Sequence, residues 1–410
     1  MPKAAKSSTT KEDSPTGNPK SADAKKEVKP TSKVVGTNAT TKTASTKLAR
    51  TKTPSTKTPS SQVAQVKPPA KSHAKPTSKA LATKPTTPAK IGAEASQPQP
   101  EEKKEKTEEE KKAERLANYR AAGKIAREVK AFITPQIKVG MKILDLCDAI
   151  ENKITELGGE CGFPANISIN NKAAHYTASP KDTSVLQDGD VVKVDFGVHK
   201  EGCIVDMAFT VNFSKDPNIK DIAIASEEAV KRAVKIIKAG SKTNELGKII
   251  ERTVKKYGFR PIQNLTGHLL EEWIVHGEKA IPTVERPHGD EMLENEVYAV
   301  EVFATTGEGR VTSSGKGEIF QLDMSSARVP IRNKAAKQIL GIIYKKYKSL
   351  PFAKRWIAKD VKAYEFAMRE LERAKKLDKY GVLQEKEGTY ISQFEQTVLV
   401  TKEGCEPLTD

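Results

Sequence analysis

After residue 113, apolar residues along the chain follow either helical or strand-like spacing. Helical spacing recurs in six segments: about 116–129, 142–157, 220–238, 244–257, 333–350 and 359–377. Strand-like runs occur at five places: 191–198, 203–211, around His268, 297–303 and 389–400. The two kinds of segment mix without strict βαβ alternation. The pattern therefore predicts an α+β fold.

The first hundred residues differ from the rest in composition. They hold 19 Lys and Arg against 5 Asp and Glu, 13 of the 23 prolines, and no aromatic residue. A segment with so little to bury cannot offset its ordering entropy. We therefore predict that residues 1–112 are a disordered tail running into a charged helical lead-in, followed by a folded domain at 113–410. The tail's spaced positive charge suits RNA or a ribosome surface, although a tail that binds nothing specific fits equally.

Several classes of protein are excluded by motifs that the sequence lacks. No apolar run approaches the roughly 18 residues of a membrane span, and the N-terminus has no apolar core of a secretion signal. The four cysteines show no CxxC spacing, and no glycine-rich phosphate loop occurs. These observations predict a cytoplasmic protein that does not associate with membranes.

Two aspartates lie in neighbouring apolar runs that have the pattern of an antiparallel hairpin. If the loop is 199–202, Asp195 faces Asp206 directly. Opposed side chains have Cβ atoms about 5 Å apart, and like charges at that distance are destabilising. The pair therefore needs a shared proton, a basic partner or a bound cation. Lys193 lies on the same face as Asp195, so a structural ion pair is one alternative, and a register error of one residue would remove the facing geometry.

Further candidate metal ligands lie in other apolar segments. His268 and His276 are close together in the sequence, and Glu301 and Glu395 each lie within a strand-like run. Each glutamate taken alone is ambiguous, because a lone Glu in a strand usually faces solvent. Together, four carboxylates and an imidazole can hold two divalent cations about 3.5–4 Å apart, and such ligands suit Mn, Fe, Co or Zn.

The order of an Asp, a second Asp eleven positions later, then His, Glu and Glu resembles that of the methionine aminopeptidases and their pita-bread relatives. Several flanking sequences match as well: Gly162-Phe163-Pro164, Ser168-Ile169-Asn170, Ala173-Ala174-His175-Tyr176, Asp195-Phe196-Gly197-Val198-His199 and Gly267-His268. The match covers roughly 113–410. A helix-like insert at about 330–380, between Glu301 and Glu395, is similar to that of the type II enzymes.

This resemblance implies a fold and a set of site residues. The fold would be the pita-bread (creatinase/aminopeptidase-like) fold, an antiparallel curved sheet covered by helices, with a helical insert subdomain. Five residues would ligate a dinuclear metal centre: Asp195, Asp206, His268, Glu301 and Glu395. Asp206 and Glu395 would bridge both ions. Four residues would contact the substrate: His175 and His276 near the scissile amide, and Phe163 and Val275 around the methionine side chain.

The resemblance also implies an activity. The enzyme would remove the N-terminal methionine from nascent chains that have a small second residue, using a metal-bridged hydroxide and two divalent ions (Co, Mn, Fe or Zn). Glu301 would shuttle a proton, His276 would stabilise the oxyanion, and His175 would contact the amide nitrogen side. We expect a monomer, with ribosome contact through the tail.

Two other functions are compatible with the same fold. A catalytically inactive pita-bread relative would bind RNA or ribosomes, but such proteins typically lose metal ligands, and all five are present here. A Pro-specific relative of the prolidase or aminopeptidase P type would carry additional histidines and a large N-terminal domain, where this chain has the tail.

Overall fold

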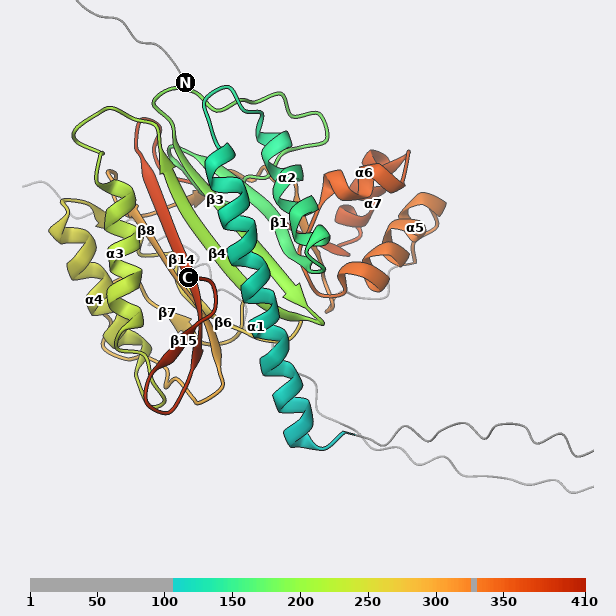
Figure 1. The fold of residues 1–410 in the computed structure, drawn as a ribbon. Coiled ribbons are helices and arrows are strands. Elements are labelled where there is room, and N and C mark those ends of the chain that lie inside the picture. The colour runs from blue at the N-terminus through green and yellow to red at the C-terminus, as the bar shows by residue number, and fades with distance from the viewer. Residues whose placement is uncertain (1–105, 326–329) are drawn as a thin grey trace, which may run out of the picture. The chain divides into compact units, whose positions relative to one another are not determined.

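The computed structural model describes residues 106–325 and 330–410 (Figure 1). The predicted disordered tail falls mainly on residues 1–105, outside this part of the chain. The first helix, α1 (Glu108–Ile133), begins five residues before the expected domain start at Ala113. Thr107 and Glu110 form a capping box, in which each side chain bonds the backbone N–H of the other residue, and this fixes the start of the helix.

The main sheet has nine strands, and all of its strand pairs are antiparallel. Seven strands follow the order β1-β3-β4-β14-β8-β6-β7, while β15 pairs with β14 and β5 with β8. Their bounds are Glu160–Ile169 (β1), Val191–Lys200 (β3), Cys203–Asn212 (β4), Arg260–Pro261 (β5), Gly267–Leu270 (β6), Ala280–Ile281 (β7), Val297–Thr305 (β8), Ile391–Val400 (β14) and Cys405–Pro407 (β15). The prediction of an α+β fold with an antiparallel sheet is confirmed.

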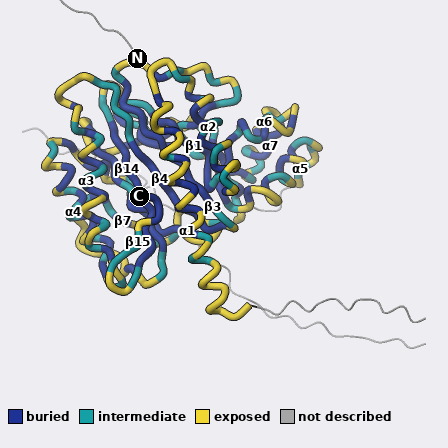
Figure 2. The backbone as a smooth tube through the Cα atoms, viewed as in Figure 1, coloured by how far each residue is buried: buried dark blue, intermediate teal, exposed yellow. Residues whose placement is uncertain are grey.

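Four long helices pack against this sheet. Besides α1 they are α2 (Ile143–Glu156), α3 (Ile222–Val234) and α4 (Thr243–Lys256), and a short 3₁₀ turn, η1 (Thr134–Gln136), follows α1. Figure 1 shows α1 crossing β3 and β4, with α2 beside β1 and α3 beside β8 and β14. Figure 2 shows that the strands beneath are buried, whereas the first turns of α1 are exposed. No helix in the described ranges is long and apolar enough to span a membrane.

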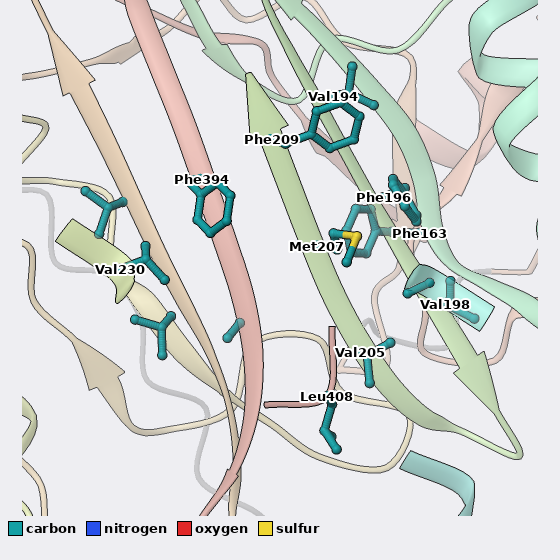
Figure 3. Packing of buried hydrophobic residues seen from close by; sticks show 14 of the residues in the cluster. Phe163, Val194, Phe196, Val198, Val205, Met207, Phe209, Val230, Phe394 and Leu408 are labelled. Carbon is teal, nitrogen blue, oxygen red and sulfur yellow. The ribbon is translucent and has the colours of Figure 1, made fainter. Parts of the chain in front are cut away.

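The two faces of the sheet differ in chemistry because side chains alternate along each strand. Apolar residues of β3 and β4 belong to the same hydrophobic cluster as the buried side of α1, and Figure 3 shows them: Val194, Phe196, Val198, Val205, Met207 and Phe209. Asp195 and Asp206 alternate with these residues, so they lie on the opposite face. The helices therefore cover one face of the sheet, and the carboxylates lie on the other.

The hairpin register differs from the predicted one. Lys200 pairs with Cys203, so the loop is the two residues Glu201 and Gly202, whose φ angles are 50° and 86°. Two positive φ values are typical of a type I′ turn, which matches the twist of the strands. The predicted four-residue loop was wrong, and His199 lies within β3, almost fully buried.

The corrected register changes the position of the two aspartates relative to each other. Asp195 pairs with Ala208 and Asp206 with Gly197, so the acids are diagonal neighbours and do not face each other directly. The shift is two residues, which preserves the alternation of the side chains. Both carboxylates therefore remain on the same face of the sheet.

The segment between β10 and β12 contains further helices and a separate hydrophobic cluster. Its elements are β10 (Ile319–Leu322), α5 (Lys334–Ile342), the π-helical turn η2 (Ile343–Tyr347), β11 (Phe352–Ala353), α6 (Lys354–Asp360), α7 (Tyr364–Arg373) and β12 (Leu377–Tyr380). We call residues 330–380 the insert. The helix predicted at 359–377 is shorter in the structure: α6 ends at Asp360, the buried Val361 adopts extended backbone angles, and α7 covers only Tyr364–Arg373. A small sheet, β11-β10-β12, and a second one, β2 (Lys172–Ala174)-β13 (Leu383–Gln384)-β9 (Thr312–Ser313), complete the fold.

Candidate metal centre

Five neighbouring strands each contribute one of the predicted ligands. Asp195 is on β3, Asp206 on β4, Glu395 on β14, Glu301 on β8 and His268 on β6, which follows the order of these strands in the sheet. The residues fall into two rows across the strands.

The first row contains three carboxylates. Glu395 pairs with Glu301 on one side and with Ala208 on the other, and Ala208 in turn pairs with Asp195. Because cross-strand partners point to the same side of a sheet, these three acids share one face.

The second row carries Asp206 and His268. Thr397 of β14 joins them: its hydroxyl donates to the carbonyl oxygen of Asp206 at 2.7 Å, and its backbone pairs with Ala299, which pairs with His268. Thr397 lies two residues after Glu395, so this row is on the same face as the first. The structure therefore brings all five predicted residues to one face of the sheet.

The ligand atoms form two overlapping groups. Atoms of Asp195, Glu301 and Glu395 lie within 4.8 Å of one another, and so do atoms of Asp206, His268 and Glu395. His268 Nε2 is 3.9 Å from both Asp206 Oδ2 and Glu395 Oε1. Glu395 belongs to both groups, so the arrangement suits two adjacent cations that share this carboxylate.

The predicted alternative of an ion pair between Lys193 and Asp195 is wrong. The fully buried Lys193 ammonium donates to the carbonyl oxygen of Asn170 at 2.8 Å, and in the described chain it forms no ion pair with Asp195. Burial lowers the pKa of Lys193 well below its usual value.

Burial and mutual repulsion raise the pKa values of the four acids. Burial raises the pKa of Asp195 from 3.8 to about 7. Burial together with neighbouring carboxylates raises the pKa values of Asp206, Glu301 and Glu395 well above their usual range. Burial lowers the pKa of His268 to about 4, so its imidazole is neutral near pH 7, as a metal ligand requires.

The donor atoms fit a pair of divalent cations. Asp195 Oδ1, Asp206 Oδ1 and Glu395 Oε1 are buried and have no hydrogen-bond partner among residues 106–325 and 330–410. Buried carboxylates without partners cost free energy unless a proton or a cation compensates their charge. Oxygen donors with one imidazole nitrogen are the ligands that Mn, Fe, Co and Zn accept.

A cavity of about 200 Å³ lies over four of these residues. Its lining also includes the four predicted substrate residues: Phe163, His175, Val275 and His276. Phe163 is on β1, and its ring lies against Gly197, where a Cβ atom would come within 2.4 Å of a ring carbon. An apolar recess beside a carboxylate cluster suits a substrate with an apolar side chain next to the reacting group.

The two non-ligand histidines are held differently. His175 follows β2 with a φ of 65°, and its Nδ1 lies 3.3 Å from the carbonyl oxygen of Gly381. The ring of His276 is 4.5 Å from that of His268, centroid to centroid. Burial lowers the pKa of His175 and takes that of His276 well below 6.5, so both rings are neutral and each carries one N–H donor.

Sequence reasoning missed several polar residues of the site, among them Gln393, Asn166 and Tyr380. Gln393 Nε2 donates to Asp195 Oδ2 at 3.2 Å and to Glu301 Oε1 at 2.9 Å, and its place two residues before Glu395 is a signal that could have identified it. Asn166 lines the cavity from β1. Tyr380 of the insert packs edge-on against His175 with 5.2 Å between ring centroids, and no local pattern indicates that contact.

Residues 117–402 match the model of metallopeptidase family M24. The chain belongs to this family. Among the M24 relatives, a methionine aminopeptidase of Methanothermobacter thermautotrophicus is 38% identical over 72% of this chain and 99% of its own length. A methionine aminopeptidase of Thermococcus onnurineus is 42% identical over 69% of this chain and 96% of its own length. A methionine aminopeptidase 2 of Verticillium alfalfae is 33% identical over 70% of this chain and 69% of its own length. The predicted resemblance to methionine aminopeptidases is confirmed.

Solved structures agree with the M24 fold. A methionine aminopeptidase from Thermotoga maritima superposes with a TM-score of 0.54 at 19% identity, over 72% of this chain and 97% of that one. A thermophilic Arx1 superposes with a TM-score of 0.61 at 18% identity, over 72% and 91%. At these identities the likeness concerns the fold alone, and it confirms the predicted pita-bread architecture.

Proposed function

We propose that this M24 protein removes the N-terminal methionine from polypeptides by metal-dependent hydrolysis. The observation that carries the proposal is the convergence of four carboxylates and one neutral imidazole, from five strands, beneath a cavity with an apolar wall. The relatives of about 40% identity that are named methionine aminopeptidases support the same reaction.

The five residues of the two rows would hold the metal ions, with Asp206 and Glu395 contacting both. We infer two divalent ions per chain, of the Co, Mn, Fe or Zn class. Such a pair, when bound, lowers the pKa of a water molecule and polarises a carbonyl group. Glu395 lies in both ligand groups, which supports its place between the ions.

The protein's own side chains would do the remaining work. Glu301 is only partly buried and lines the cavity, so it can receive a proton from the attacking water and pass it to the leaving amine. His276, beside His268, would donate its N–H to the oxygen that becomes negative, and His175 would hold the amide nitrogen side of the scissile bond. Phe163 and Val275 would enclose the methionine side chain.

The cellular setting of the reaction is a further part of this proposal. We infer that the substrates are nascent chains with a small second residue, met in the cytoplasm by a monomeric enzyme. The basic residues 1–100 would add salt-sensitive attraction to ribosomal RNA.

The test is release of methionine from Met-Ala-Ser by protein loaded with Mn or Co, beside an Xaa-Pro dipeptide. We expect turnover of the first peptide, none of the second, and loss of activity with a chelator. Bound metal without methionine release would reject the proposal in favour of an inactive relative, and hydrolysis of the dipeptide would point to a Pro-specific enzyme.

A further inference from the structure

We propose that Arg355 of α6 is a positioning residue for the apolar wall of the cavity, acting through Glu151 and Thr177 on an irregular stretch of β1. The proposal rests on the proposed function, because it assigns the control of methionine recognition at the same site. It concerns residues that lie outside both ligand groups.

The stretch concerned is a bulge in β1. Phe163 pairs with Gly197 and Asn166 with Asp195, so β1 has one more residue than β3 between these two pairs. A β-bulge of this kind turns side chains in a new direction and leaves backbone groups unpaired. The bulge residues are Pro164, which has no N–H, and Ala165. The residues on either side, Phe163 and Asn166, both line the cavity.

Side chains rather than strand pairing hold the backbone of Ala165, and one of them, the thiol of Cys147, donates to its carbonyl oxygen at 3.5 Å. Glu151 of α2 accepts the N–H of Ala165 on its Oε1 at 3.1 Å, and the hydroxyl of Thr177 donates to the carbonyl oxygen of Ala165 at 2.7 Å. Glu151 and Thr177 make the two shorter contacts with Ala165, so the shape of the bulge depends mainly on these two side chains.

One guanidinium group holds both of these side chains. Arg355, only 2% exposed, donates through Nη2 to Glu151 Oε1, and through Nη1 to Thr177 Oγ1 at 2.6 Å and to the carbonyl oxygen of Ala178 at 3.3 Å. The indole N–H of Trp356 donates to the other Glu151 oxygen at 2.7 Å. The planar fork of arginine can reach two acceptors in fixed directions, which a lysine ammonium cannot do.

These contacts connect the insert with two walls of the cavity. Thr177 lies two residues after His175, and the intervening Tyr176 accepts the N–H of Ile167, next to Asn166, at 2.7 Å. Pro351, four residues before Arg355, lines the cavity itself. A displacement of Arg355 would therefore move the Phe163 wall and the His175 wall together, while the ligands on β4, β14, β8 and β6 stay in place.

The experiment compares three variants with one matched control. Arg355→Met removes the guanidinium, and Arg355→Lys keeps the positive charge without the planar pair of donors. The double variant Glu151→Leu with Arg355→Met replaces the buried ion pair by apolar side chains of similar volume. The control is Lys359→Met, because Lys359 also joins α6 to α2, through Asp148 at 3.4 Å, without contacting Glu151, Thr177 or Ala165. All are assayed well below their melting temperatures.

We expect the preference for Met-Ala-Ser over Leu-Ala-Ser, as a ratio of kcat/KM, to fall about tenfold or more in Arg355→Met, mainly through KM for the methionine peptide. The preference of Arg355→Lys should lie between those of Arg355→Met and the wild type. Metal stoichiometry should be the same in all variants, and Lys359→Met should show the wild-type preference. Hydrogen exchange of residues 163–167 should accelerate in Arg355→Met, a readout that needs no turnover.

Two results would overturn the proposal. One is an unchanged ratio and unchanged exchange at 163–167 in folded Arg355→Met. The other is a double variant that regains both thermal stability and the full methionine preference, because the ion pair would then only fasten the insert. Failure of the wild type to release methionine would instead refute the proposed function, and the exchange measurement would still report on the bulge.

Discussion

The sheet and the insert contribute to one cavity in different ways. The sheet places its ligands through regular strand pairing, so each ligand position follows from its neighbours. The insert adds Pro351 from a loop and Tyr380 from the end of β12, and separate contacts such as that of Arg355 with Glu151 hold it. Substitutions in the sheet should therefore abolish metal-dependent hydrolysis, whereas substitutions in the insert should alter which peptide is accepted.

Asp206→Asn should have the largest effect. The amide removes one anionic donor from the second row, so we expect metal stoichiometry to fall and kcat/KM to drop by about 10³-fold or more. Because the aspartate repels neighbouring acids in the metal-free protein, melting of that form should not occur at a lower temperature. Metal analysis, peptide kinetics and calorimetry measure the three quantities.

The control for this variant is Asp188→Asn, an exposed aspartate that pairs with Lys215 far from the ligand groups. Its kinetics should match the wild type. Retained turnover in Asp206→Asn would contradict the assignment of chemistry to the sheet.

The four buried acids should lower the stability of the metal-free protein as pH rises from about 4 to about 7. Burial raises the pKa of Asp195 from 3.8 to about 7, so over this interval the unfolded chain loses a proton that the folded chain retains. The raised pKa values of the three neighbouring acids act in the same direction. The lowered pKa values of His175, His199, His268 and His276 act in the opposite direction, so the effect of Asp195 is measured against Asp195→Asn. The loss should be on the order of 2 kcal/mol or more.

Urea unfolding at pH 5 and pH 8, with a chelator and with Mn, measures this effect. Added metal should weaken or reverse the trend, since cations compensate the ionised carboxylates. A metal-free wild type that loses no more stability between pH 5 and pH 8 than Asp195→Asn does would show that burial does not raise the pKa of Asp195.

Tyr380→Ala should have a smaller effect, of a kind that belongs to the insert. The substitution removes the ring that packs on His175, and it should raise KM for Met-Ala-Ser several-fold while leaving metal stoichiometry unchanged. Tyr380→Phe is the matched control, because it keeps the ring and loses only the hydroxyl bond to Gln321. Loss of metal in Tyr380→Ala would remove the distinction between the two regions.

Deletion of residues 1–100 should have the smallest effect on catalysis. Peptide kinetics should stay within about twofold of the full chain, because the five ligands and the cavity lining all lie beyond residue 160. Ribosome cosedimentation at low and high salt should show weaker, less salt-sensitive binding of the shortened chain. Equal binding of both forms would refute a docking role for the tail.

Local properties of the sequence single out the buried acids as candidates, and the family resemblance completes the proposed ligand set. Acids in apolar runs are costly, and alternation along a strand fixes the face on which each one lies. The hairpin register was wrong by two residues because Glu201 adopts a positive φ, which few non-glycine residues do, and the sequence alone favoured a longer loop.

Features that depend on long-range packing could not be predicted in this way. Tyr380 reaches His175, and Arg355 reaches Glu151, across about 200 residues of sequence, and neither contact leaves a periodic signal. The break between α6 and α7 likewise lies at the buried Val361 and not at a proline or glycine.

The tight turn at Glu201 and Gly202 has a consequence for how the hairpin can change in length. Side chains alternate between the two faces of a strand. If β4 shifts by two residues relative to β3, Asp206 stays on the face that carries the other four candidate ligands. If it shifts by one residue, Asp206 turns to the face that carries Val194 and Phe196. Natural variation that preserves a working centre should therefore be tolerated in steps of two at this hairpin, and a single-residue insertion should survive only where a new bulge absorbs it.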